Sequence, residues 1–110
     1  MRTLITGATG FVGGHLAECL LAAGDEVHGL ARCAEWPAAL THLAPRIPLH
    51  AADLQDTGRT ARLLAELRPD RIAHLAGYAD AGASFRDLDA AWSGNLNATR
   101  SLYDAIARTE

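Results

Sequence analysis

Thr3-Leu4-Ile5-Thr6-Gly7-Ala8-Thr9-Gly10-Phe11-Val12-Gly13 is the stretch of sequence that decides the fold. Its first four residues are apolar or β-branched and end at a glycine, which is typical of a strand that is buried on both faces. Three glycines spaced three apart follow at once, and helical spacing of apolar residues begins at Phe11. A strand, a tight glycine turn and a helix in this order predict the first unit of a parallel α/β sheet.

The helix after this turn is expected to end near Gly24. Apolar or small residues recur at helical steps of three and four from Phe11 onward. They are Val12, Leu16, Cys19, Leu20 and Ala23. Gly24 stands where a helix would stop, because glycine readily adopts the left-handed conformation of a helix end. We therefore predict one amphipathic helix on which these residues share a face.

The same alternation of strand and helix continues along the chain. Further strands are predicted at 27–31, 47–51 and 72–76. Pro48 lies inside the second of these, where it has no N–H group to donate to a neighbouring strand. The stretch 34–44 fits either a helical turn after Pro37 or an irregular crossover, and the sequence leaves both open.

Two more helices complete the pattern. Asp56 can cap the first of them, which ends at Pro69 and Asp70. Its inward residues are predicted to be Thr60, Leu63, Leu64 and Leu67. One stripe marks the second helix: Leu88, Trp92, Asn95, Leu96, Thr99, Leu102, Tyr103 and Ile106. Strands joined by right-handed crossovers predict a single domain over 1–110, an incomplete doubly wound parallel α/β sheet of about four strands with helices on both faces.

Composition and charge fit one soluble globular domain. Hydrophobic residues make up 49% of the 110 residues, charged residues make up 21%, and the net charge is -3 without a long block of either sign. Nucleic acid and an anionic membrane are therefore not expected as partners. No apolar run approaches the roughly 18 residues that span a bilayer, and the opening residues lack a signal-peptide layout, so a cytoplasmic location is expected.

No metal site is expected from the cysteines and histidines. Cys19 and Cys33 are too few and too irregularly spaced for a disulfide framework or a Cys-x-x-Cys site. The five histidines show no His-x-x-x-His spacing on a predicted helix. His74 lies between apolar neighbours in a predicted strand, and we interpret it as a core histidine with hydrogen-bond partners.

The glycine turn carries the predicted chemistry. Gly7 permits a tight turn, Gly10 lets the backbone approach a pyrophosphate, and Gly13 lets the helix pack close to the strand. Free N–H groups and the positive end of the helix can then bind the phosphates. The predicted cofactor-binding residues of this turn are Gly7, Thr9, Gly10, Phe11, Val12 and Gly13. A P-loop is disfavoured because no Gly-Lys-Ser/Thr follows; a purely structural turn is the alternative.

The residues after the second and third strands indicate how the adenosine half is bound. Arg32 follows a neutral residue, where a guanidinium fits a 2′-phosphate that a carboxylate would repel, so NADP is expected over NAD. A solvated surface arginine is the alternative. Asp53 and Leu54 follow the third strand, where they can contact adenine, although Asp53 can equally serve as a helix cap.

The end of the fourth strand and the last helix supply the remaining candidates. Leu75, Ala76 and Gly77 offer small residues where the ribose and nicotinamide side of a cofactor must approach the backbone, although Gly77 can equally serve only the turn. Asn95 is polar on an apolar stripe, so it needs a partner inside the protein. It is expected either to tie the helix to a strand or to support a catalytic group through water.

Four motifs in this order resemble those of the extended short-chain dehydrogenase/reductase family, which contains NAD(P)-dependent sugar-nucleotide epimerases, dehydratases and reductases. They are Thr6 to Gly13, Asp53-Leu54, His74 to Gly77 and Asn95 to Thr99. Val27 to Arg32 and Ser84-Phe85 look most like GDP-mannose dehydratases and GDP-deoxyhexose reductases. The resemblance implies a Rossmann-type fold, a dinucleotide cofactor and, for Asn95, the family's structural and active-site asparagine.

The family's chemistry is hydride transfer at a sugar carbon by a Tyr-x-x-x-Lys pair and a Ser or Thr. The chain contains no lysine, and neither Tyr78 nor Tyr103 is followed by one at the fourth position. The resemblance therefore implies a domain truncated at its carboxy-terminal side, inactive alone, with a nucleotide-sugar substrate only in a full-length parent. A non-catalytic NADP(H)-sensing module and a fragment that no longer binds cofactor are the alternatives. An exposed sheet edge also predicts self-association, including a homodimer.

Overall fold

The computed structural model describes residues 1–75 and 98–109. Strands and helices alternate along it, as the sequence predicts. In chain order they are β1 (Arg2–Thr6), α1 (Phe11–Ala22), β2 (Glu26–Ala31), the 3₁₀ helix η1 (Ala38–Leu43), β3 (Leu49–Ala51), α2 (Thr57–Leu67), β4 (Arg71–His74) and α5 (Ala98–Thr109). No helix in these two ranges is both long enough and apolar enough to cross a membrane.

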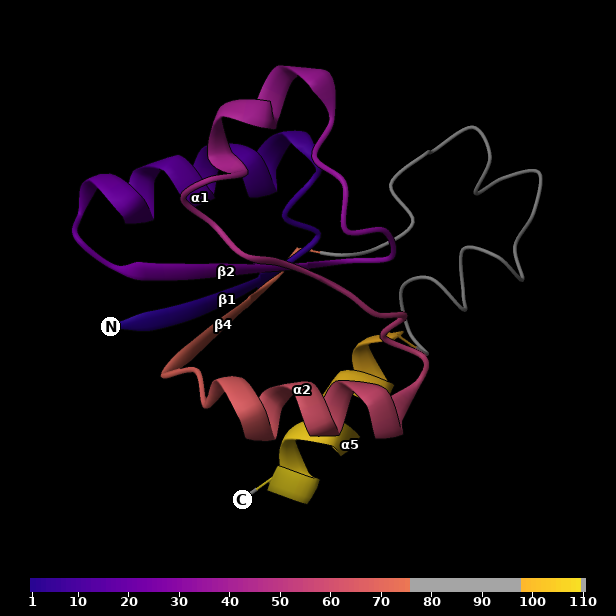
Figure 1. The fold of residues 1–110 in the computed structure, drawn as a ribbon. Coiled ribbons are helices and arrows are strands. Elements are labelled where there is room, and N and C mark those ends of the chain that lie inside the picture. The colour runs from indigo at the N-terminus through magenta and orange to yellow at the C-terminus, as the bar shows by residue number, and fades with distance from the viewer. Residues whose placement is uncertain (76–97, 110) are drawn as a thin grey trace.

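The four strands form one parallel sheet in the order β3-β2-β1-β4. Thr6, the last residue of β1, pairs with Leu30 on one side and His74 on the other. The carboxyl ends of these strands therefore lie along the same edge. Figure 1 shows α1 and η1 on one face of the sheet and α2 and α5 on the other. This confirms the predicted Rossmann-type α/β fold.

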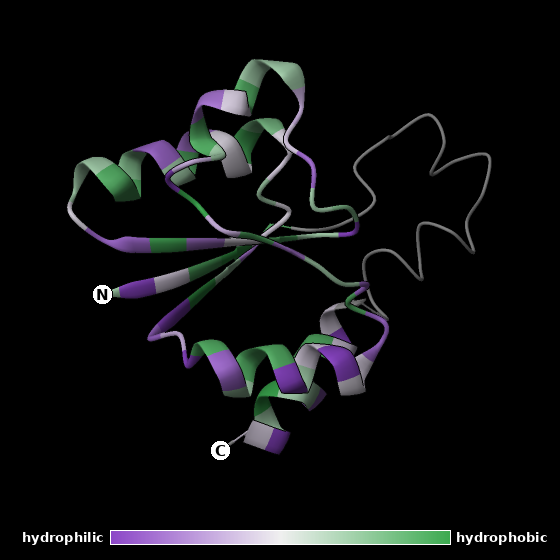
Figure 2. Ribbon diagram, in the orientation of Figure 1, coloured by the Kyte–Doolittle hydropathy of each residue, from purple (hydrophilic) through white to green (hydrophobic). Residues whose placement is uncertain are grey.

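Two apolar clusters, one on each face of the sheet, form the core. Alternate residues of β1 enter them, Leu4 on the α2 side and Ile5 on the α1 side. The first cluster contains Leu4, Leu30, Ala52, Leu54, Leu63, Leu64, Leu102 and Ala105. The second contains Ile5, Ala8, Ala17, Val27, Leu43 and Ile47. Figure 2 shows green, hydrophobic segments on the side of α2 that faces the sheet, and β1 is buried on both faces as predicted.

The face that α1 buries differs from the predicted one. Val12 is 62% exposed, and Cys19 and Ala23 are also exposed, whereas the fully buried residues of α1 are Gly13, Gly14 and Ala17. The helix lies so close to β1 that only very small residues fit between them. The prediction holds for Leu16 and Leu20, which pack against the core, and is wrong for Val12, Cys19 and Ala23, because small size determines which face lies closest to β1.

Both later strands are shorter than predicted. β3 begins at Leu49 because Pro48 cannot donate; its carbonyl oxygen accepts from the Gly29 N–H at 2.9 Å instead. β4 ends at His74, so Leu75 lies just beyond it, and Ala76 is outside the described residues. The stretch left open after Pro37 is the 3₁₀ helix η1.

The helix α2 is capped and packed as predicted. The Asp56 carboxylate accepts a hydrogen bond from the Arg59 N–H at 3.1 Å. Thr60, Leu63 and Leu64 are buried, and Leu67 packs against the same core. The helix ends at Arg68, which adopts a left-handed conformation with φ 48° directly before Pro69.

The last helix, α5, packs against α2 through a narrower face than predicted. Leu102 and Ala105 are buried and Ile106 is partly buried, but Tyr103 is 69% exposed. Tyr103 follows Leu102 directly, so it is turned about 100° away from the core. Its predicted place on the inward stripe is wrong. Four other predicted stripe residues lie outside the described residues: Leu88, Trp92, Asn95 and Leu96.

Candidate functional site

The glycine turn between β1 and α1 is held in a tight, well-bonded conformation. Gly7 has φ +72°, which favours glycine, and its N–H donates to the Leu30 carbonyl of β2 at 3.1 Å. The Gly10 N–H donates to the Gly7 carbonyl at 3.1 Å. A Cβ at Gly13 would lie 2.2 Å from that same carbonyl oxygen, so only glycine fits there. The predicted roles of Gly7 and Gly13 in the turn are thus visible in the geometry.

The start of α1 presents main-chain N–H groups that find no acceptor among the described residues. The first helical bond runs from the Gly14 N–H to the Gly10 carbonyl at 2.9 Å. Within residues 1–75 and 98–109, the N–H groups of Phe11 and Val12 have no backbone acceptor, no side chain caps the helix, and its first turn has no acidic residue. Both residues are exposed. An anion at this position would meet donors and the positive end of the helix together.

Gly10 leaves space in front of these donors. A Cβ built there would meet only the Gly7 carbonyl oxygen, at 3.4 Å, which is an ordinary contact distance. Gly10 itself has an extended backbone with φ -80°. The fold therefore tolerates a side chain at this position. Without one, a ligand can approach the N–H groups of the turn more closely.

Arg32 lies at the same edge of the sheet, directly after β2. The carbonyl oxygen of Leu30, two residues earlier, accepts the Gly7 N–H, so the end of β2 is tied to the glycine turn. The Arg32 side chain is exposed, and no carboxylate in the described part of the chain forms an ion pair with it. Its charge is available to an anion near the turn.

The sequence left open whether Asp53 contacts adenine or caps a helix. Asp56 is the cap of α2, as described above. Asp53 is exposed, its carboxylate accepts from the Gln55 N–H at 2.9 Å, and its carbonyl oxygen accepts from the Asp56 N–H at 2.9 Å. Leu54 is only 7% exposed and belongs to the core. Asp53 thus holds the turn before α2 through its hydrogen bonds, and its side chain remains exposed to solvent.

His74 is a half-buried residue with hydrogen-bond partners, as predicted. Its Nδ1 lies 2.6 Å from the Thr6 hydroxyl, and its Nε2 lies 2.9 Å from the Thr99 hydroxyl. Desolvation by burial lowers the pKa of His74 below its ordinary value of 6.5. The Leu75 N–H donates to the same Thr6 hydroxyl at 3.0 Å. These contacts join β1, β4 and α5 at the carboxyl edge of the sheet.

Two further glycines, which sequence reasoning passed over, bring this edge together. A Cβ at Gly29 of β2 would lie 2.9 Å from both the Ala8 Cβ and the Leu49 Cδ1. A Cβ at Gly14 would lie 2.8 Å from Leu40 of η1. A glycine inside a strand pattern is itself a signal of close approach, so Gly29 was open to prediction. It allows the glycine turn to lie against β2.

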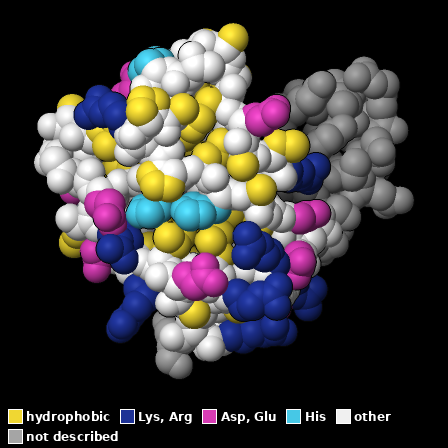
Figure 3. All heavy atoms as spheres, in the orientation of Figure 1, with side chains coloured by type: hydrophobic (Ala, Val, Ile, Leu, Met, Phe, Trp, Pro, Cys, Tyr) yellow, Lys and Arg dark blue, Asp and Glu magenta, His cyan; other side chains and the backbone are white. Residues whose placement is uncertain are grey.

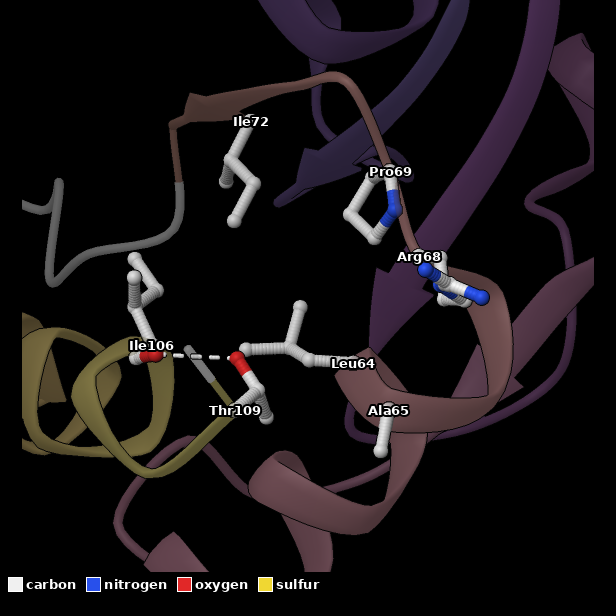
Figure 4. A pocket seen from close by; sticks show the side chains of 7 residues that line it. All are labelled: Leu64, Ala65, Arg68, Pro69, Ile72, Ile106 and Thr109. Atoms are coloured by element: carbon white, nitrogen blue, oxygen red, sulfur yellow. Dashed lines mark hydrogen bonds between the residues drawn. The ribbon is translucent and has the colours of Figure 1, made fainter.

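A cleft lies elsewhere, at the opposite end of the sheet. It has a volume of about 600 Å³ and opens between α2, the start of β4 and the end of α5 (Figure 4). Its lining is Leu64, Ala65, Arg68, Pro69, Ile72, Ile106 and Thr109. Apolar side chains predominate, and β4 has no strand on this side among the described residues.

Arginine side chains gather over one helix, and the described residues hold no cluster of metal ligands. Figure 3 shows arginines gathered over α2, on the face of the sheet opposite α1. Residues 1–75 and 98–109 hold no group of three or more His, Cys, Asp or Glu arranged to bind a metal ion. Ala76, Gly77 and Asn95, which complete the predicted site, lie outside the described residues.

Comparison with known proteins gives consistent matches along the whole chain. The model of the NAD dependent epimerase/dehydratase family matches residues 3–110. The GDP-mannose 4,6-dehydratase of Vibrio cholerae is 34% identical over 114 residues, which covers 96% of the chain and 31% of that relative. The UDP-glucose 4-epimerase of Neisseria meningitidis serogroup B is 30% identical over 112 residues, covering 97% and 33%.

Solved structures agree with these matches. The UDP-glucose 4-epimerase of Thermus thermophilus, in complex with NAD, superposes with a TM-score of 0.87 at 32% sequence identity. The superposition covers 99% of the chain and 34% of the epimerase. The chain therefore spans about a third of the length of the relatives that it matches.

Proposed function

Because the chain belongs to the NAD-dependent epimerase/dehydratase family, we propose that it is the dinucleotide-binding amino-terminal part of a sugar-nucleotide epimerase, dehydratase or reductase. The observation that carries this proposal is the uncapped start of α1, where the N–H groups of Phe11 and Val12 have no acceptor within the described ranges. A pyrophosphate supplies the charge and the acceptor oxygens that these donors lack. The Thermus relative was itself solved with NAD.

The proposed site extends along the carboxyl edge of the sheet. The turn from Gly7 through Thr9 to Gly13 holds the pyrophosphate, and Asp53 with the Leu54 backbone meets the adenine. Leu75, Ala76 and Gly77 approach the ribose on the nicotinamide side. The parallel register supports this arrangement, because it aligns the ends of β1, β2 and β4. Ligands of open parallel sheets bind outside these strand ends.

We propose further that the cofactor is NADP. Arg32 is exposed beside the glycine turn and has no ion-pair partner within the described ranges, so its guanidinium is free to bind a 2′-phosphate in a bidentate manner. NAD, as in the Thermus complex, is the alternative. Calorimetry with NADPH and NADH distinguishes them: NADPH binds at least tenfold more tightly in this account, and Arg32→Gln removes the difference. Equal affinities for both cofactors in the unchanged chain would overturn the NADP assignment.

Catalysis requires residues beyond this binding site. When bound, the nicotinamide would supply hydride chemistry at a sugar carbon, and the residues named above would bind and orient it. The 110 residues contain no lysine and hence no Tyr-x-x-x-Lys pair. We therefore propose that they bind the cofactor without turning over a nucleotide sugar. Hydride transfer by this chain, followed as nicotinamide absorbance with a GDP- or UDP-sugar, would contradict the proposal.

The chain has the elements that bind a dinucleotide but lacks the catalytic pair. This favours one other candidate function, a module that senses NADP(H) and regulates a partner. Both candidates require dinucleotide binding, and only the first requires a longer protein. The cleft on the free side of β4 supports the first, because a further strand beside β4 would cover Ile72 and Ile106. Calorimetry that detects neither NADPH nor NADH would contradict both.

A further inference from the structure

A chain of three hydrogen-bonded side chains crosses the sheet edge beside the glycine turn. Thr6 is fully buried at the end of β1 and directly precedes Gly7. Its hydroxyl lies 2.6 Å from Nδ1 of His74, the last residue of β4. Nε2 of His74 lies 2.9 Å from the hydroxyl of Thr99, in the first turn of α5. Positions far apart in the sequence are thus linked through one imidazole ring.

A threonine hydroxyl can accept one hydrogen bond and donate another at the same time. The Leu75 N–H donates to the Thr6 oxygen at 3.0 Å, so Thr6 can donate its hydroxyl proton to Nδ1 of His74. Nδ1 of His74 then accepts, which leaves Nε2 protonated to donate to Thr99. In this arrangement the ring is the neutral Nε2–H tautomer.

This arrangement fixes the point where the chain leaves β4. The Leu75 N–H is held twice by Thr6, by its carbonyl oxygen at 3.1 Å and by its hydroxyl at 3.0 Å. The other side of the same residue leads into Gly7, whose N–H is bound to Leu30. A single buried threonine therefore sets the spacing between the glycine turn and the exit of β4.

We infer that Thr6, His74 and Thr99 form a positioning relay, which holds the exit of β4 and the start of α5 at a fixed distance from the glycine turn. The inference rests on the proposed function: the pyrophosphate contacts lie on one side of the relay, and the proposed ribose contacts begin on the other. None of the three side chains is required to touch the cofactor. Each acts by keeping the two halves of the site in register.

The chain offers a matched control for the relay. Thr3 lies on the same strand as Thr6 and is also buried, at 3% exposure, but its hydroxyl has no hydrogen-bond partner among the described residues. Thr6→Val and Thr3→Val therefore make the same chemical change in the same strand, and only the first breaks the relay. Thr6→Ser keeps the hydroxyl, and Thr99→Val interrupts the relay at α5 without altering β1.

Two measurements on the full 110-residue chain test the relay. In calorimetry with NADPH, we expect Thr6→Val and Thr99→Val to weaken binding about tenfold. This is the expected effect of losing one hydrogen bond to the imidazole of His74. Thr6→Ser and Thr3→Val stay within about twofold of the unchanged chain. In nitrogen NMR of the imidazoles without ligand, His74 shows the Nε2–H tautomer in the unchanged chain, in Thr6→Ser and in Thr3→Val. That signature is lost in Thr6→Val.

The outcomes separate the relay from the proposed function. If the unchanged chain binds no dinucleotide, the proposed function and the relay's positioning role both fail. If it binds NADPH, and Thr99→Val and Thr6→Val bind it equally well, the relay alone is overturned. Should Thr6→Val fail to fold, Thr99→Val decides by the same affinity comparison. An unchanged His74 tautomer in a folded Thr6→Val chain would also overturn the relay.

Discussion

At the scale of single residues, two glycines of the turn face different demands. Gly13 is required by the fold, because a Cβ there would lie 2.2 Å from the Gly7 carbonyl oxygen. Gly10 is not, since a Cβ there meets that oxygen only at 3.4 Å. In our account Gly10 is instead required by the cofactor, which approaches the open N–H groups behind it.

Alanine at these two positions should therefore separate stability from binding. We expect Gly13→Ala to lower the free energy of unfolding by about 1–3 kcal/mol, the usual cost of overpacking. Gly10→Ala should cost less than about 1 kcal/mol, the difference between glycine and alanine at a helix cap, while NADPH affinity falls at least tenfold. Urea unfolding and calorimetry measure the two effects. A Gly10→Ala chain that binds NADPH normally would argue against phosphate contact at this turn.

His74 should make stability depend on pH. Burial lowers the pKa of His74 from its ordinary value of 6.5, so above about pH 6.5 the ring is neutral in both the folded and the unfolded chain. Below this pH the unfolded chain takes up a proton that the folded chain resists. The free energy of unfolding therefore falls on acidification until the folded pKa is passed.

The measurement is urea unfolding at about pH 7.5 and pH 5.5 for the unchanged chain and for His74→Asn, which removes the titrating ring. The loss of stability on acidification should be smaller in the variant. Other histidines contribute equally to both chains, so the difference isolates His74. The same loss in both would show that His74 does not resist protonation in the fold.

At the scale of elements, the start of α2 separates a structural aspartate from a binding one. Asp56 caps the helix through the Arg59 N–H, whereas Asp53 accepts only in the exposed turn before it. We expect Asp56→Ala to lower the free energy of unfolding by about 1 kcal/mol and to leave NADPH affinity unchanged. Asp53→Ala should instead lower the NADPH affinity and change the free energy of unfolding less than Asp56→Ala does. Thermal unfolding and calorimetry on both variants check this; equal effects of the two changes on affinity would contradict the adenine contact.

The sequence predicted the order of the elements and the ends of α1 and α2, because those depend on local chemistry. Gly24, Asp56 and Pro69 act on their own neighbours in the chain, and the structure places helix ends beside each of them. The buried faces were less predictable. Val12 and Tyr103 are hydrophobic yet exposed, because the close approach of a neighbouring element, and not hydropathy, selects the face that is buried.

The site divides in the same way. The glycine turn was predictable, since its glycines are explained by strand, turn and helix within one short stretch. The bonds of Thr6 to His74 and of His74 to Thr99 were not, because they join residues 68 and 25 positions apart. Only the parallel register, which pairs Thr6 with His74, brings these groups together.

At the scale of the whole molecule, β4 has a free edge among the described strands, and two partly buried isoleucines line the cleft near it. Ile72 and Ile106 line the cleft, and β4 lies at an edge of the sheet formed by the described strands. Unpaired strand edges and apolar patches favour association. We expect the average mass of the chain to rise with concentration from the monomer value of 11.6 kDa.

Sedimentation equilibrium over a hundredfold concentration range measures this association. Phe11→Ser is the control, because Phe11 is 81% exposed on the far side of the sheet from the cleft and should not contribute. The variant should associate as the unchanged chain does. A chain that stays monomeric throughout would contradict the role given to the β4 edge, and loss of association in Phe11→Ser would assign it to the glycine turn.

The most direct test of the whole account is a crystal structure of the chain with NADPH. We expect the diphosphate at the start of α1, with its oxygens about 2.7–3.2 Å from the N–H groups of Phe11 and Val12 and the 2′-phosphate beside Arg32. A diphosphate bound anywhere else, or a turn rearranged so that these two N–H groups point away from it, would contradict the account.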